Sequence, residues 1–194
     1  MVAVLQRSGP ERAVPEGIAS GALQALFCIQ HDSTMTRLLR RPTLSHFGGD
    51  SALYYEWQAR VYQLEGRGPE MRTYADSARR ILERRVLGRP DDAGFHARLG
   101  LAYARLGRKG DAVREGEKAT NLWPPSKDAW GGPGYILNLA EIQAILGDPD
   151  AAVEQLRRVL AQRGEIALTK TSLRYDSRFA SLRNAPAFRQ LVGN

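Results

Sequence analysis

The chain repeats a short pattern of apolar and small residues after 40 positions, and this repeat sets the tightest limit on its fold. The pattern reads Leu-Gly-x-x-Tyr-x-x-x-Gly-x-x-x-x-Ala over residues 99–112 and Leu-Ala-x-x-Gln-x-x-x-Gly-x-x-x-x-Ala over residues 139–152. A degenerate third copy lies 41 residues upstream, where the matching residues are Ala59, Tyr62, Gly66 and Ala78. A period of about 40 residues indicates a supersecondary unit that recurs and stacks on itself.

Each unit has the pattern of two antiparallel helices. Apolar residues at helical spacing are followed by a glycine suited to a left-handed helix end, such as Gly107, and then by an amphipathic helix. We expect Gly100 and Ala119 at the crossing of the two helices, where a larger side chain would push the axes apart. Tyr103 is predicted to fill the groove between hairpins, as is Tyr62 in the upstream copy. In the central unit, Asp111 is predicted to cap the second helix and Pro124 to stop it.

This pattern resembles the tetratricopeptide repeat. In the best copy the signature positions hold Leu99, Gly100, Tyr103, Ala112, Ala119 and Pro124. The copies depart from the family pattern at His96 and Gly116, and in the third copy at Gln143, Leu156 and Val159. The resemblance implies an all-α fold, a right-handed superhelix of antiparallel helical hairpins (an α-solenoid), with protein binding as its usual role.

A second, shorter echo lies near the end of the chain, where a Phe-x-x-Leu pair over residues 179–182 returns nine residues later, over 188–191. Asp176 or Ser177, and Asn184, are predicted to start two brief helices. Their apolar sides would cover the last hairpin, whose outer face a solenoid otherwise exposes. We therefore divide the chain into a degenerate N-terminal helical segment (1–47), tetratricopeptide-like repeats (48–168; about 52–92, 93–132 and 133–166) and a C-terminal capping segment (169–194).

The order of repeats and closing segment has a narrower likeness. It is similar to the C-terminal repeat region of large bacterial multidomain proteins that carry a serine/threonine kinase, an adenylate cyclase or a transcription-activator domain. Their closing Leu-Arg-x-Asp-Pro-x-Phe motif is matched in most positions over residues 173–188, although Asp176-Ser177 and Ala185-Pro186 replace the two Asp-Pro pairs. The likeness implies a receptor or assembly module attached to an output domain.

The connection over residues 123–134 lengthens the usual 34-residue period and must loop out without breaking the stack. It contains Trp123 and Trp130. Two interpretations remain open: the indoles cover the exposed hairpin edge, or they form an aromatic lip for a ligand.

The sequence offers no pattern of a metal, cofactor or catalytic site. The three histidines His31, His46 and His96 are scattered, and Cys28 is the only cysteine. Zinc sites need ligands at short, paired spacings, and the glycines over 48–49 and 131–134 lack the lysine of a phosphate-binding loop. We therefore expect a non-catalytic chain without a metal or a cofactor, in which the histidines are surface or satisfied core residues.

Charge and hydropathy limit the partners. The formal net charge is +7, with a pI near 9.9, and five arginines of one predicted helix could contact phosphates: Arg79, Arg80, Arg84, Arg85 and Arg89. Because Ile81, Leu82 and Val86 would face the core, these arginines read first as the solvated face of an amphipathic helix. Nucleic-acid binding stays the less favoured alternative. No apolar stretch is long enough for a membrane span and no export signal is visible, so we expect a cytoplasmic protein.

The tetratricopeptide likeness also implies where a partner would bind, because first helices line the concave face of that superhelix. The alignment places seven residues there: Trp57, Arg60, Arg98, Leu101, Arg105, Asn138 and Glu141. This mixture suits an extended peptide with acidic side chains or a terminal carboxylate. Glu56 and Arg60 stand where the family's carboxylate clamp has Lys and Asn, so a receptor for chaperone tails is not supported. A sensor segment of a signalling or transcription-linked regulator is the alternative.

Overall fold

The structure is a computed structural model that describes residues 42–162 and 168–193, and this part of the chain is all-helical without a strand. The α-helices are α4 (Ser51–Leu64), α5 (Gly68–Gly88), α6 (Ala93–Arg105), α7 (Lys109–Leu122), α8 (Gly132–Ile145), α9 (Pro149–Leu160), α10 (Lys170–Tyr175) and α11 (Pro186–Val192), and the 3-10 helices are η1 (Leu44–Phe47) and η2 (Ser177–Leu182). None of these helices is long and apolar enough to cross a membrane. The helices expected before residue 41, with Cys28 and His31, lie outside the described residues.

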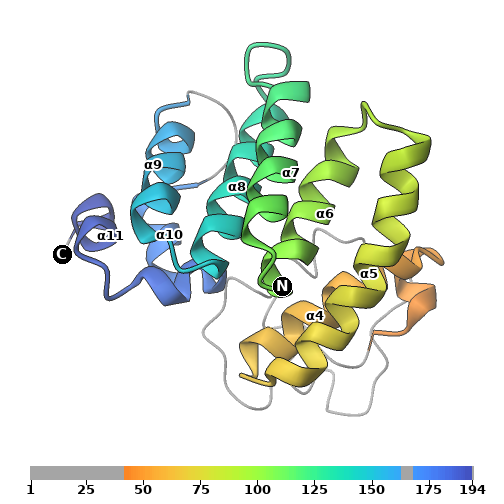
Figure 1. Cartoon of the computed structure of the whole chain (residues 1–194). Coiled ribbons are helices and arrows are strands. Elements are labelled where there is room, and N and C mark those ends of the chain that lie inside the picture. Colours follow the sequence, from red (N-terminus) through yellow and green to blue (C-terminus); the bar gives the residue numbers. More distant parts are fainter. Residues whose placement is uncertain (1–41, 163–167, 194) are drawn as a thin grey trace, which may run out of the picture.

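Three helical hairpins follow one another along the chain: α4–α5, α6–α7 and α8–α9. Figure 1 shows them side by side, and α6 packs against α5, α7 and α8. The glycine between the two helices of each hairpin has a left-handed backbone, with φ of +70° at Gly66 and +75° at Gly107 and Gly147. This conformation strains any residue with a Cβ atom, which explains the glycine at these three turns. The prediction of left-handed helix ends is confirmed.

The first and second helices of the central hairpin approach each other closely at Gly100 of α6. A Cβ atom built there would lie 3.0 Å from the carbonyl oxygen of Ala112 and 3.2 Å from the backbone nitrogen of Gly116, both on α7. It would also lie 2.8 Å from Ile142 Cδ1 on α8. Gly100 therefore sits at the predicted crossing. At Gly116, where the family pattern has an aromatic ring, Ile142 and Leu139 of α8 fill the space.

Tyr103 joins the central hairpin to the one before it. Its ring is buried, and its hydroxyl donates a hydrogen bond to Glu83 Oε1 on α5 at 2.8 Å. Burial and this hydrogen bond raise the pKa of Tyr103 to about 12. The prediction that Tyr103 fills the groove between hairpins is confirmed. Tyr62, its counterpart upstream, stacks instead on Tyr74 of its own hairpin, with ring centroids 5.3 Å apart.

Helix starts were predicted less well than helix turns. Asp92 and Asp148 cap α6 and α9 by accepting hydrogen bonds from backbone N–H groups of their first turns. Asp111, by contrast, is not the cap of α7, which begins at Lys109 after Arg108. Its carboxylate pairs with arginine side chains one turn to either side, Arg108 and Arg114. The predicted stop is confirmed, since α7 ends at Leu122, before Pro124.

The C-terminal segment packs against the last hairpin, α8–α9. Asp176 caps η2 by accepting a hydrogen bond from the Arg178 N–H at 2.9 Å, but α11 starts one residue later than predicted, with Ala185 rather than Asn184 at its cap position. The Phe and Leu pairs of both turns are buried in one cluster with α8 and α9 residues, and α11 packs against α9. Figure 1 shows α11 beside α9 at one end of the molecule, and α10 packs against α11.

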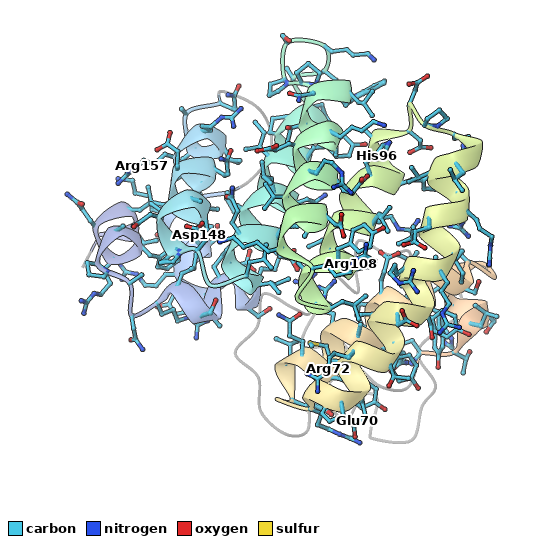
Figure 2. All side chains as sticks on the ribbon, viewed as in Figure 1. Glu70, Arg72, His96, Arg108, Asp148 and Arg157 are labelled. Carbon is cyan, nitrogen blue, oxygen red and sulfur yellow. The ribbon has the colours of Figure 1, made fainter. Side chains whose placement is uncertain are left out.

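His96 is a buried residue of α6 with a partner for each ring nitrogen. Nδ1 lies 2.6 Å from Glu115 Oε2 on α7, and Nε2 lies 2.8 Å from the carbonyl oxygen of Pro90, before α6. Figure 2 shows His96 among the helices of the stack rather than at its edge. The interpretation of His96 as a satisfied core residue is confirmed, and the side chain joins α6 to α7.

Asp128 organises the connection over residues 123–134, which extends beyond the ends of α7 and α8 in Figure 1. Its carboxylate accepts hydrogen bonds from Trp123 Nε1 at 2.9 Å and from the Trp130 and Gly131 N–H groups at 2.8 and 3.0 Å. The Trp130 side chain is 67% exposed, so it does not cover the hairpin edge. An aromatic lip for a ligand stays a prediction.

Candidate functional site: the charged face of the first helices

The seven residues predicted to line the binding face all lie on the first helices α4, α6 and α8. Three of them are buried: Trp57, Arg105 and Glu141. Arg60, Arg98, Leu101 and Asn138 are half-buried. The buried three cannot be direct contacts for a partner in this conformation, so the expected open surface is narrower than the sequence suggested.

Arg98 links α6 to α4. Its guanidinium pairs with Glu56 at 2.8 Å and with Asp50 at 3.5 Å. Long arginine side chains thus span between the two first helices. The pKa of the Glu56 carboxyl is raised above its ordinary value, because the effect of burial exceeds the opposing effect of the charge and hydrogen bonds of Arg98.

Asp50 connects three helices at once. As the cap of α4, its carboxylate accepts hydrogen bonds from the Ala52 and Leu53 N–H groups, and it binds both terminal nitrogens of Arg85 on α5 at 3.0 and 2.9 Å. Burial alone would raise the pKa of this carboxyl. The hydrogen bonds from Arg85 and Leu53 and the charges of Arg98 and Arg85 outweigh it and lower the pKa from 3.8 to about 2.

The charge of Asp50 should therefore stabilise the fold at neutral pH and cease to do so in acid. Because the folded-state pKa is depressed, this contribution is present above about pH 4 and is lost as pH falls towards 2. Asp50→Asn keeps an acceptor for the cap but loses the charge, and should lower the free energy of unfolding at pH 7 by about 1–2 kcal/mol, after discounting for solvent screening. Urea unfolding of both proteins at several pH values measures the difference.

The matched control is Asp91→Asn, an exposed acidic residue before α6. It should change the free energy of unfolding by less than about 0.5 kcal/mol at pH 7. A stability difference between wild type and Asp50→Asn that stays constant from about pH 7 down to about pH 3 would contradict the role assigned to the Asp50 charge.

Arg105 and Glu141 form the most deeply buried ion pair of the described residues. Their side chains are 3% and 5% exposed, and Arg105 Nη2 lies 3.2 Å from Glu141 Oε1 on α8. Arg105 Nε also donates a hydrogen bond to Gln63 Oε1 on α4 at 2.9 Å. One arginine of α6 therefore ties α4 and α8 together.

Arg60 extends this arrangement to the C-terminal cap. Burial lowers the pKa of its guanidinium, Glu141 raises it, and the positive charges of Arg178 and Arg105 lower it further. Arg178 in turn binds Asp176, at 2.6 Å between Nη2 and Oδ2. Arg60 on α4 is therefore close enough to charged side chains of α6, α8 and η2 for these charges to shift its pKa. We call the whole set the first-helix network: Asp50, Glu56, Arg60, Gln63, Arg98, Arg105, Glu141, Asp176 and Arg178.

The network largely neutralises itself, which decides what it can do chemically. A carboxylate that approaches Arg98 must compete with Glu56, and a cation must compete with the resident arginines. Such a surface distinguishes between partners by the positions and order of their charged groups rather than by their net charge. Sequence reasoning had not assigned Asp50, Gln63, Asp176 and Arg178 to this face.

The five arginines in the second half of α5 and directly after it, the basis of the nucleic-acid alternative, are mostly paired. Four of the five form ion pairs with Asp76, Glu83, Asp50 or Asp92, at distances of 2.7 to 3.5 Å: Arg79, Arg80, Arg85 and Arg89. Leu82 is fully buried, and Ile81 and Val86 pack on the same core cluster. The interpretation of this helix as amphipathic is confirmed, and resident carboxylates offset much of its positive face.

Among residues 42–162 and 168–193, no group of three or more His, Cys, Asp and Glu side chains is arranged to hold a metal ion. Comparison of the chain with protein-family models, with curated proteins and with solved structures gave no match.

Proposed function

We propose that this chain is a non-catalytic cytoplasmic module that binds a protein or an extended peptide along the face of its first helices. The observation that supports this most is the first-helix network, in which four elements bring charged side chains to one face. Burying charges costs free energy that apolar packing would not. Buried or half-buried charged residues in place of apolar ones are most common at functional sites, and here such residues lie along the first helices.

The half-buried members of the predicted face would make the direct contacts. Arg98 can exchange Glu56 for an acidic side chain or a terminal carboxylate of the partner, and Leu101 and Asn138 add apolar and amide contacts along the groove. Trp57, Arg105 and Glu141 would hold the helices at the spacing that this groove requires. The partner that fits is an extended, acidic peptide segment.

The proposal includes a right-handed tetratricopeptide-like superhelix. Hairpins that pack on their neighbours, left-handed glycine turns and the small residue at Gly100 all agree with it. The closing turns, with Phe179 and Phe188 buried against the last hairpin, favour the related alternative of a sensor segment in a bacterial signalling or transcription-linked regulator. Nucleic-acid binding is less favoured because the α5 arginines already have acidic partners.

Peptides selected from a random library on the full chain provide the test. If they bind the first-helix face, they should be enriched in Asp and Glu. Asn138→Glu places a negative charge on the groove without removing a known ion pair, and should weaken their binding about tenfold through like-charge repulsion. Fluorescence anisotropy with labelled peptides measures the change.

Asn121→Glu is the matched control, because it makes the same substitution at an exposed position of α7, a second helix. It should leave peptide affinity within about twofold. Circular dichroism confirms that both variants fold. The proposal fails if the two substitutions weaken binding equally, or if the full chain selects no peptide.

A further inference from the structure

The C-terminal cap holds a second cluster of arginines, separate from the first-helix network. Three arginines from different segments, together with one aromatic and two small or apolar residues, line a surface pocket of about 250 Å³: Arg174, Arg183, Phe188, Arg189, Val192 and Gly193. Arg174 lies on α10, Arg183 follows η2 and Arg189 lies on α11. Three arginines from three segments of the cap therefore line one opening.

This pocket differs from the other arginine-rich parts of the described chain in its lack of carboxylates. Most arginines of residues 42–162 and 168–193 lie within 4 Å of an Asp or Glu oxygen, as on α5, but the pocket lining contains no acidic residue. Within this part of the chain, Arg183 and Arg189 form no ion pair. Arg183 Nη2 donates a long hydrogen bond, of 3.4 Å, to the Tyr175 carbonyl oxygen. Among the described residues, therefore, no carboxylate of the lining offsets the positive charge of the pocket.

The pocket is also built on the core. Phe188 is 1% exposed and belongs to the cluster that joins α8, α9 and the closing turns. Arg174 donates hydrogen bonds to the carbonyl oxygens of Val192 and Gly193, which fixes the end of α11 against α10. Arg183 and Arg189, both exposed, are left to face a ligand from positions that the core defines.

We propose that this pocket binds a phosphate group. Guanidinium groups match phosphate oxygens in pairs, and a doubly charged phosphate offsets three arginines better than a single carboxylate does. The volume lies below the roughly 300–1,000 Å³ of pockets that bury drug-sized ligands, so it suits a phosphate monoester rather than a nucleotide. A small phosphorylated molecule and an anionic lipid headgroup share this chemistry.

Calorimetric titration of the full chain with inorganic phosphate and with O-phosphoserine, at constant ionic strength, tests the first source. Sedimentation with phosphatidylcholine vesicles, with and without phosphatidic acid, tests the second. Arg183→Gln combined with Arg189→Gln should lower the affinity for the binding probe at least about tenfold. The control combines Arg84→Gln with Arg158→Gln, which removes the same charge from exposed positions outside the pocket.

Binding of the soluble probes, or of phosphatidic acid vesicles alone, supports the proposal and identifies the source of the phosphate. Phenylglyoxal labelling of the wild-type chain gives a measurement that does not depend on the variants, because the probe that binds, either a soluble phosphate compound or phosphatidic acid vesicles, should protect Arg183 and Arg189 but not Arg84. The proposal is overturned if no probe binds, if the control pair loses affinity equally, or if the probe that binds leaves the labelling of Arg183 and Arg189 unchanged.

Discussion

Gly100→Val is expected to lower the free energy of unfolding by about 3 kcal/mol, at the upper end of the range for overpacked cores. The reason is that the α7 backbone, at Ala112 and Gly116, lies 3.0 to 3.2 Å from the point where the new Cβ would stand. A flexible side chain such as Ile142 can move away, but a helix backbone cannot do so without separating the hairpin. Urea unfolding followed by circular dichroism measures the loss, which should appear as a fall in Tm of about 6–12 °C for a chain of this size.

Gly110→Ala is the control for the chemistry of the substitution. Gly110 also lies in a helix, α7, but a Cβ there would meet nothing within 4 Å, and its φ is not positive. Alanine should leave stability unchanged or raise it by up to about 1 kcal/mol, because it restricts the unfolded chain. Equal stability of the Gly100→Val and Gly110→Ala proteins would show that the α6–α7 crossing is not as close as described.

The features of the fold that the sequence predicted are those that depend on residue size or backbone conformation at one position. Gly66, Gly107 and Gly147 take a conformation that only glycine adopts freely, so their recurrence predicted the hairpin turns directly. Gly100 was predictable for a related reason, since a close helix crossing tolerates only a small side chain. Because each of these requirements concerns the residue type at a single position, it can be recognised from the amino-acid sequence alone.

Helix starts were less predictable because several polar residues compete for the same position. Asp111 has the residue type of a cap, yet the turn after Gly107 is so short that α7 begins two residues before it. Its carboxylate then pairs with Arg108 and Arg114, which offer charged hydrogen bonds stronger than those of a neutral cap. The cap predicted at Asn184 is wrong by one residue, because α11 begins at Pro186, and proline is favoured at the first position of a helix.

The first-helix network could be predicted only in part. The alignment placed Arg60, Leu101 and Glu141 in one column of the first helices, which put these residues on one face but did not predict how their charges pair. The contacts of Asp50 with Arg85 and Arg98 were not visible, because residues 35 and 48 positions apart meet only when the hairpins are placed in space. Burial of Arg105 was likewise hidden, since an arginine on a first helix reads equally well as solvated.

That burial gives Arg105 the largest expected effect among the charged residues. Arg105→Met should lower the free energy of unfolding by about 3–5 kcal/mol, because it leaves the Glu141 carboxylate 5% exposed without its direct partner. Gln63 loses its hydrogen bond from Arg105 at the same time. Arg157→Met is the matched control: Arg157 pairs with Glu154 at 3.7 Å on the surface of α9, and its loss should cost less than about 1 kcal/mol. Urea unfolding at neutral pH measures both.

A second substitution separates the buried charge from the lost arginine contacts. If the cost arises from an unpaired carboxylate, Arg105→Met combined with Glu141→Gln should be more stable than Arg105→Met alone by at least about 1.5 kcal/mol, since the neutral amide no longer requires a cation. A double variant no more stable than the single one would mean that Arg60 already neutralises Glu141, and that Arg105 acts through packing. The double variant restores neutrality without the original spacing of α4, α6 and α8. If the proposed function is correct, its affinity for acidic peptides should therefore be as low as that of Arg105→Met, and the network would determine peptide binding as well as stability.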